Sequence, residues 1–256
     1  MKPPAPSCAR SFFPQGCWAR VTRRAVQAAL RAIFAEGGVP DRLRVDNGAP
    51  RGSWNDLPPD LALWLIGLGV GRIWNRPRHC QANGHVERAH GVLQQWSEPE
   101  RCPDAATLQQ RLDALSERQR EQLIGRHGQR RSDAYPTLGA GGRSYDPARE
   151  AADWERQRVW RFLAARHWRR RGDKVGRISL SNRARPVGRR YAGQEVAIGF
   201  DPRQGVWIVR DDAGQVLGQP PAPELRQASI LALEVTRQRI RTPPHPRPNP
   251  TAASQA

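Results

Sequence analysis

The chain has 256 residues, of which 38% are hydrophobic, and it carries a formal net charge of +18 at neutral pH. This length allows one or two domains with their own hydrophobic cores. The longest apolar stretch, LALWLIGLGVG, is too short to span a bilayer, and the first residues lack the continuous apolar segment of a signal peptide. We therefore expect a cytoplasmic protein with no membrane partner.

The four cysteines form no C-x-x-C pair and follow no regular spacing, so neither a zinc site nor a disulfide framework is indicated. The positive charge is almost wholly arginine, since Lys2 and Lys174 are the only lysines. GC-rich codon usage explains the choice of arginine over lysine, but it does not explain the charge imbalance. Between Arg156 and Arg190 there are twelve arginines and one lysine against the single acid Asp173. An imbalance of this size favours a polyanionic partner.

The first third of the chain alternates helical and strand-like patterns. Residues 1–19 are irregular, and an apolar pattern with helical spacing then begins after Thr22 and ends at Gly37 and Gly38. RLRV (42–45) is typical of a short buried strand that ends just before Asp46. A second helix covers about 61–68, VGRIW (70–74) predicts a second strand, and a third helix covers about 85–96. This order predicts an α/β fold whose strands present side chains at their carboxyl ends.

The rest of the chain changes character. We expect a helix over about 104–124, a Gly- and Arg-rich connection, and a helix over 148–165. Short alternating runs then follow at HWRRR, RISL, EVAIGF, VWIVRD and QVLGQ, and they predict a small barrel of about five strands. One weak helix, ELRQASILALEVTR, precedes a Pro-rich tail from Thr242 that we expect to be disordered.

Asp46 and Glu87 are the two acids with a candidate catalytic position. Asp46-Asn47-Gly48 is by itself an ordinary turn sequence, because Asn and Gly tolerate positive φ. Glu87 lies near a helix N-terminus, where the helix dipole favours a carboxylate for structural reasons alone. The segment before Glu87 adds information, because it reads P-x-x-x-Q-x-N-G-x-V-E-R from Pro77 to Arg88.

These two motifs, in this order, closely resemble the retroviral-integrase-like core of bacterial insertion-sequence transposases, the DDE recombinases with an RNase H-like fold. In that family three carboxylates hold two Mg²⁺ (or Mn²⁺) ions, which promote in-line attack on a DNA phosphodiester. The resemblance implies that Asp46 is the second carboxylate and Glu87 the third. It also implies that four residues shape the surrounding active-site loops, namely Asn47, Gly48, Asn83 and Gly84.

Two departures from the family pattern are visible. The separation of Asp46 and Glu87 is a little longer than is common, and Cys80 stands where a proline is usual.

The first carboxylate of the family is missing, because no acid before Val45 lies in a strand pattern. About twenty irregular residues precede the first helix, which leaves no room for the first three strands of such a core or for an upstream helix-turn-helix. We therefore expect a truncated or frameshifted copy of a transposase.

The resemblance continues into the basic C-terminal part. VGRRYAGQEVAIGFD and VWIVRDDAG resemble the small SH3-like barrel that follows the catalytic core in many such transposases and binds DNA. The implied architecture is an incomplete RNase H-like core (20–125), a linker and helix (126–165), a small basic β-barrel (166–220), and a weak helix with a disordered tail (221–256). The implied DNA-binding residues are Arg88, Arg169, Arg170, Arg171, Lys174, Arg177, Arg189 and Arg190.

Three hypotheses about activity stay open at this point. In the first, the chain still cuts or joins DNA as a transposase or integrase in the bacterial cytoplasm, close to the nucleoid and as a homo-oligomer. In the second, it binds DNA without chemistry, and Trp160 and Trp168 serve either as core or as stacking residues. In the third, it is a relic with no selected function. We also expect residues 20–100 alone to aggregate and residues 150–220 alone to fold, because the contacts of the barrel are local.

Overall fold

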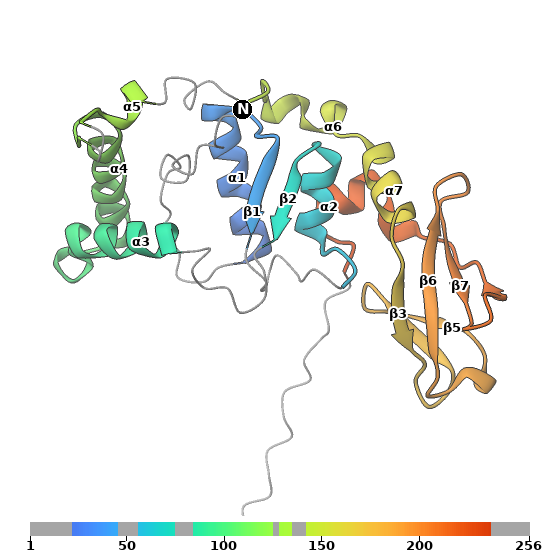
Figure 1. The fold of residues 1–256 in the computed structure, drawn as a ribbon. Coiled ribbons are helices and arrows are strands. Elements are labelled where there is room, and N and C mark those ends of the chain that lie inside the picture. The colour runs from blue at the N-terminus through green and yellow to red at the C-terminus, as the bar shows by residue number, and fades with distance from the viewer. Residues whose placement is uncertain (1–21, 46–55, 75–83, 125–127, 135–141, 237–256) are drawn as a thin grey trace, which may run out of the picture.

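The structure is a computed structural model that describes residues 22–45, 56–74, 84–124, 128–134 and 142–236 (Figure 1). The chain is a mixed α/β protein. Its helices are α1 (Arg23–Gly37), α2 (Asp60–Gly67), α3 (Gly84–Ser97), α4 (Ala105–Glu121), α5 (Arg131–Ala134), α6 (Glu150–Asp153), α7 (Arg156–Ala164) and α8 (Gln227–Leu231). Its strands are β1 (Arg42–Val45), β2 (Gly71–Trp74), β3 (Trp168–Arg171), β4 (Arg177–Leu180), β5 (Arg183–Pro186), β6 (Glu195–Asp201), β7 (Val206–Arg210) and β8 (Val216–Gly218).

The N-terminal part is a β–α–β unit built from β1, α2 and β2, with α1 packed against α2. Strands β1 and β2 pair in parallel, with Arg42 opposite Gly71 and Val45 opposite Trp74. Helix α1 begins where the Thr22 hydroxyl accepts a hydrogen bond from the Ala25 amide at 3.1 Å, which satisfies one free amide of the first turn. These elements confirm the helices and strands that the sequence predicts in this region.

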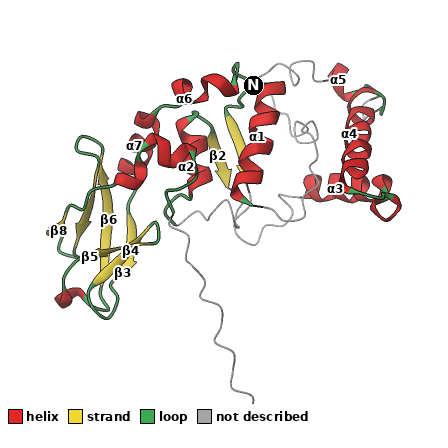
Figure 2. Ribbon diagram, turned by 180° about the vertical axis from the view of Figure 1, so that it is seen from behind, coloured by secondary structure: helices red, strands yellow, loops and turns green. Residues whose placement is uncertain are grey.

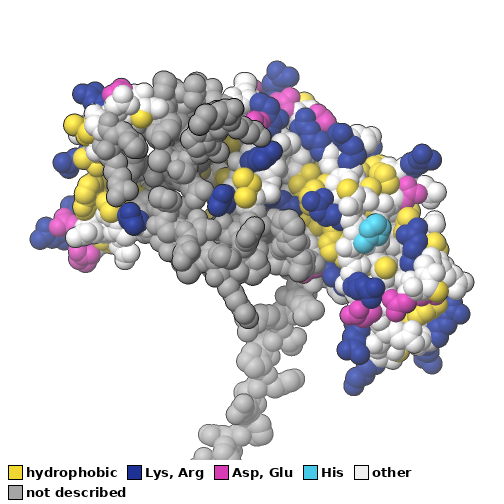
Figure 3. All heavy atoms as spheres, in the orientation of Figure 1, with side chains coloured by type: hydrophobic (Ala, Val, Ile, Leu, Met, Phe, Trp, Pro, Cys, Tyr) yellow, Lys and Arg dark blue, Asp and Glu magenta, His cyan; other side chains and the backbone are white. Residues whose placement is uncertain are grey.

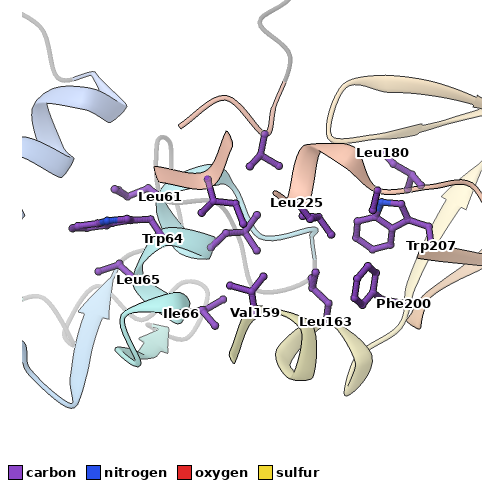
Figure 4. Packing of buried hydrophobic residues seen from close by; sticks show 14 of the residues in the cluster. Leu61, Trp64, Leu65, Ile66, Val159, Leu163, Leu180, Phe200, Trp207 and Leu225 are labelled. Carbon is purple, nitrogen blue, oxygen red and sulfur yellow. The ribbon is translucent and has the colours of Figure 1, made fainter. Parts of the chain in front are cut away.

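Helix α2 is the most deeply buried element, since all eight of its residues are buried. Figure 4 shows Leu61, Trp64 and Leu65 on one side of this helix and Ile66 on the other, near Val159 and Leu163 of α7. Phe34 of α1 stacks on Trp64 with ring centroids 6.0 Å apart. On the other side, α7 and α8 pack against α2. A helix that is hydrophobic all round needs such complete cover, which explains why its sequence lacks a polar face.

The predicted helix over 148–165 is wrong in one respect, because it is broken in the middle. A 3-10 turn (Pro147–Arg149) and α6 end at Asp153, Trp154 adopts an extended conformation, and α7 begins at Arg156. The extended Trp154 turns its indole into α2, where its Nε1 donates a hydrogen bond to the Trp64 carbonyl at 3.1 Å. Burial of one large aromatic side chain therefore decides where the helix stops.

The C-terminal strands form two antiparallel sheets. One sheet has the order β3-β6-β7-β8, and the other is the β4–β5 hairpin, of which the sequence predicts β4 (RISL) but not β5. Ser181 and Asn182 make the hairpin turn with positive φ values of 50° and 59°, as the favoured two-residue turns require. Strand β5 (RARP) lacks alternating apolar residues and ends in a proline, so it gives no strand pattern.

The strands of residues 166–220 do not close into one hydrogen-bonded barrel within the described part of the chain. The β4–β5 hairpin makes no ladder with the larger sheet. It packs instead through Ile178 and Leu180, which join the same buried cluster as Trp207 of β7 (Figure 4). Buried and exposed side chains alternate along β4 and β7, so each strand has one apolar face. These apolar faces pack against each other and hold the hairpin to the larger sheet in place of a hydrogen-bonded ladder.

The segment after β8 is part of the core. Leu225, Ile230, Leu233 and Val235 are buried, and the short helix α8 packs on α2. The expected long weak helix is therefore wrong, since α8 has only five residues and its neighbours form 3-10 and turn structure. The amide of Thr236 donates to the fully buried Asp60 carboxylate at 3.0 Å, which ties this segment to the start of α2.

Helices α3 and α4 pack against each other, apart from the buried cluster around α2 (Figures 1 and 2). Helix α4 begins at the predicted place, where Asp104 accepts a hydrogen bond from the Thr107 amide at 2.7 Å. None of the described helices is both long and apolar enough to cross a membrane.

Candidate nucleic-acid interface

The carboxyl ends of strands β1 and β2 lie at the same edge of the small parallel sheet. Because the pair is parallel and in register, Val45 and Trp74 end side by side at this edge. Asp46, Asn47 and Gly48, which follow Val45 directly, lie outside the described residues, and so does Asn83.

Gly84 is the first residue of α3, and Glu87 lies in its first turn. The side chain of Glu87 falls outside the part that the structure describes. The structure therefore leaves the pairing of Asp46 and Glu87 as a prediction. No group of three or more His, Cys, Asp or Glu residues able to hold a metal occurs among the described residues, a set that excludes Asp46. The Mg²⁺ site implied by the resemblance also stays a prediction.

Three buried carboxylates elsewhere in the chain serve structural roles. Asp60 accepts from Arg23 Nη1 at 2.9 Å, and Glu224 accepts from Arg185 Nη2 at 2.9 Å and from Trp207 Nε1 at 3.0 Å. Each side chain is fully buried, so the paired arginine compensates a charge that would otherwise be costly to bury. These pairs join distant segments of the chain.

Glu150 is the third buried carboxylate, and it forms a bidentate ion pair with Arg31. Arg31 of α1 donates to its two oxygens at 2.9 and 2.6 Å, and the Tyr145 hydroxyl also donates to it. Burial alone raises the pKa of Glu150, but the hydrogen bonds from Arg31 and Tyr145 outweigh it and lower the pKa below its ordinary value. Burial and the hydrogen bond to Glu150 in turn raise the pKa of Tyr145. This cluster fixes α1 to the segment before α7.

The predicted DNA-binding side chains of the C-terminal part are mostly exposed. Strand β3 alternates, so that Arg169 and Arg171 are exposed while Arg170 is half-buried and pairs with Asp56. The other exposed members of the predicted set are Lys174, Arg177, Arg189 and Arg190, together with Arg88 on α3. On the face shown in Figure 3, dark-blue basic side chains outnumber the magenta acidic ones over this part of the molecule.

Some of these cations already have partners within the chain. Arg169 Nη1 lies 3.3 Å from Glu195 and 3.4 Å from Asp212, although all three side chains are more than half exposed. Exposed pairs of this kind contribute little to stability and exchange readily for another anion. Asp173, the single acid of the basic stretch, accepts from the amides of Val175 and Arg177 at 2.9 and 2.8 Å. Those backbone hydrogen bonds lower the pKa of Asp173 and identify it as a turn residue.

The two tryptophans that the sequence left open differ in role. Trp168 is buried and meets Trp207 edge to face, with centroids 6.3 Å apart, which makes it a core residue. Trp160 is half-buried against Phe200, and the Arg156 guanidinium lies 4.6 Å from the centroid of its ring.

A basic pocket that the sequence analysis missed lies between the start of β2 and the α7–β3 segment. Its volume is about 970 Å³, and its lining includes the five arginines Arg72, Arg158, Arg161, Arg166 and Arg169, together with His167. We call these six residues and the space between them the arginine cleft. The basic character of residues 156–190 is a sequence signal for most of them. Nothing in the sequence indicates that Arg72 lies near them, because its position beside them depends on the packing of α7 onto α2.

No protein-family model matches this sequence.

Proposed function

We propose that this chain is a DNA-binding protein related to the DDE transposases and integrases, and that its basic C-terminal part contacts the phosphate backbone. The observation that carries the proposal is the row of exposed cations on β3, β4 and the turn before β6. Phosphate contacts by arginine release counterions, which supplies affinity without a need for base recognition. The motif around Asp46 and Glu87 supports the family assignment.

A salt titration of DNA affinity tests this proposal. The full chain is titrated into a fluorescent DNA duplex of random sequence, and anisotropy is read between about 50 and 200 mM salt. If six to ten phosphates are contacted, affinity falls by about 10³ to 10⁵ over this range. A flat salt response, or no binding at the low-salt end, would refute DNA binding.

Matched substitutions locate the interface. Replacing Arg177, Arg189 and Arg190 with glutamine removes three exposed cations, and each lost phosphate contact lowers the slope of log affinity against log salt by about 0.9. The control is Arg118→Gln, which removes an exposed arginine from α4. An equal loss per removed charge in both variants, one third as large in Arg118→Gln as in the triple variant, would mean that net charge alone, and not this surface, determines binding.

A catalytic version of the proposal rests on the two motif carboxylates. Here Asp46 and Glu87 would hold Mg²⁺ or Mn²⁺ and support strand cleavage and transfer, within a homo-oligomer of the chain. Carboxylates suit this chemistry because Mg²⁺ prefers hard oxygen ligands in a strict octahedral geometry. A strand-transfer assay with either metal compares the native chain with Asp46→Ala and Glu87→Ala. Activity that is absent, or that survives both substitutions, removes the catalytic version and leaves DNA binding to be judged by the salt titration.

A further inference from the structure

The arginine cleft concentrates positive charge in a concave site. Helix α7 supplies Arg158 and Arg161, the following segment supplies Arg166 and His167, and β2 supplies Arg72. Asp56 is the one acid in the described lining, and it already pairs with Arg170. Charges of one sign on the low-dielectric walls of a concave site focus the field and attract counterions.

Two of these arginines meet at one aromatic ring. The Arg166 guanidinium lies 3.8 Å from the centroid of the Phe162 ring, and that of Arg72 lies 5.1 Å from it. Cation–π contact stabilises each guanidinium and fixes its position. The two cations also repel each other, and burial together with the charge of Arg166 lowers the pKa of Arg72 to about 10. The fold therefore holds two guanidinium groups close together on one ring in the wall of the cleft.

Arg161 and Arg166 provide free donors for such an anion. Arg161 Nε donates to the Gln157 carbonyl at 3.3 Å, and Arg166 Nη1 donates to the Phe162 carbonyl at 3.3 Å. Within the described ranges, no carboxylate forms an ion pair with either side chain. Arg158 differs, because Glu155 holds its Nη2 at 2.6 Å. Planar guanidinium groups with open donors match the oxygen geometry of phosphate.

We propose that the arginine cleft is a phosphate-binding site that holds one stretch of nucleic-acid backbone between α7 and β2. This inference rests on the proposed DNA-binding function and adds a second contact surface to it. Arg161 and Arg166 contact the phosphate oxygens, and Arg72 supplies long-range attraction from the wall of the cleft. None of these three residues belongs to the set that the sequence predicts to bind DNA.

The test uses the full chain and the double variant Arg161→Gln/Arg166→Gln. Arg118→Gln is the control for lost charge, and the two variants are compared per charge removed. Both side chains of the double variant are exposed, and loss of the Arg166–Phe162 contact costs up to about 1 kcal/mol, so we expect its thermal midpoint to lie within about 4 °C of the native value. Its affinity for the random-sequence duplex falls at least tenfold at low salt, and its salt slope decreases by about 1.8, which is 0.9 for each lost contact. A second readout needs no variant, since the duplex should shift the Nε–H NMR signals of Arg161 and Arg166 in the native chain.

The outcomes separate this inference from the proposed function. Native affinity and slope in the double variant, with unshifted Nε–H signals, overturn the cleft site but leave DNA binding through Arg177, Arg189 and Arg190 intact. Absence of duplex binding by the native chain overturns both proposals. Inorganic phosphate is titrated in parallel. If it shifts the two signals while the duplex does not, the cleft binds a small phosphate-bearing molecule, and the nucleic-acid occupant is wrong.

Discussion

Gly67→Ala in α2 tests whether the packing of Trp154 onto α2 holds this helix to the segment between α6 and α7. In the interior of an isolated helix this substitution stabilises by about 1 kcal/mol, because alanine has the higher helix propensity, and this is the upper limit at Gly67, the last residue of α2. In this fold, an alanine Cβ at position 67 would lie 1.9 Å from Trp154 Nε1 and 2.0 Å from its Cε2. Ordinary contact begins at 3.4 Å, so the indole or the helix must move by more than an ångström.

The expected size follows from the contacts that this movement breaks. Overpacking of a well-filled core costs about 1–3 kcal/mol. The hydrogen bond from Trp154 Nε1 to the Trp64 carbonyl contributes about 1 kcal/mol, and both groups are buried. After subtraction of the gain in helix propensity, we expect a net loss of about 2 kcal/mol. For a chain of this size, that loss lowers the thermal midpoint by about 4–8 °C.

Gly91→Ala is the matched control. Gly91 is exposed in the interior of α3, and an added Cβ would meet no atom within 4 Å. The same chemical change should therefore stabilise the chain by up to about 1 kcal/mol, or leave it unaltered if α3 unfolds separately. Urea unfolding followed by tryptophan fluorescence measures both variants. If Gly67→Ala is as stable as the native chain, Trp154 does not pack on α2 as described.

Three further predictions concern buried charges and chain segments. Because the pKa of Glu150 is lowered in the folded state, its contribution to stability is present above the ordinary pKa of 4.5 and is lost as pH falls through the folded value. Glu150→Gln should flatten the acid side of a stability–pH curve from urea unfolding, and an unaltered curve would contradict this. Glu224→Leu leaves the Arg185 guanidinium buried without its partner, and we expect the free energy of unfolding, measured by chemical denaturation, to fall by about 3 kcal/mol. Glu195→Leu, which removes one partner of an exposed pair, is the control and should cost much less. Residues 150–220 alone should give a poorly dispersed NMR spectrum, while the chain from 22 to 236 gives a dispersed one; a folded monomeric fragment would show that α2 is dispensable.

The last of these predictions reverses the expectation drawn from the sequence. The basic strand region was expected to fold by itself because its strands are close together in the chain. In the structure, Val159 and Leu163 of α7 pack into a cluster that also contains Trp64 and Ile66 of α2 (Figure 4). Leu225 also belongs to this cluster and follows residue 220. The fragment 150–220 would therefore expose apolar surface at two places. That residues 20–100 alone aggregate stays a prediction, and the packing of α7 and α8 on α2 adds a physical reason for it, since α2 would lose this cover.

Local patterns predicted the secondary structure well where one segment determines its own conformation. The Thr22 cap, the turn glycines and the alternation of β4, β6 and β7 depend on neighbours within a few residues, and these elements lie where the sequence places them. The break at Trp154 and the burial of the segment after β8 depend on contacts with α2, which lies some ninety residues or more earlier in the chain. Periodicity contains no information about such long-range contacts, so these features were missed.

The same distinction applies to the candidate sites. The basic surface could be predicted because twelve arginines fall within one short stretch. The arginine cleft could not, because Arg72 belongs to a strand that reads as an ordinary apolar segment and approaches Phe162 only in the folded chain. The pairing of Asp46 with Glu87 stays a motif prediction, because Asp46 and the side chain of Glu87 lie outside what the structure describes.

The register of the small parallel sheet connects the arginine cleft with the edge that precedes Asp46. Arg72 lies opposite Leu43, and the two strands end together at Val45 and Trp74. Since a parallel strand rises about 3.3 Å per residue, the level just beyond Val45 is about 10 Å along the sheet from Arg72. One strand of DNA carries a phosphate about every 3.4 Å along the helix axis. If the proposed backbone in the cleft runs along these two strands, about three nucleotides separate the phosphate beside Arg72 from the level just beyond Val45. On that path, the cleft would also select which phosphodiester reaches the edge that Asp46 follows in the sequence.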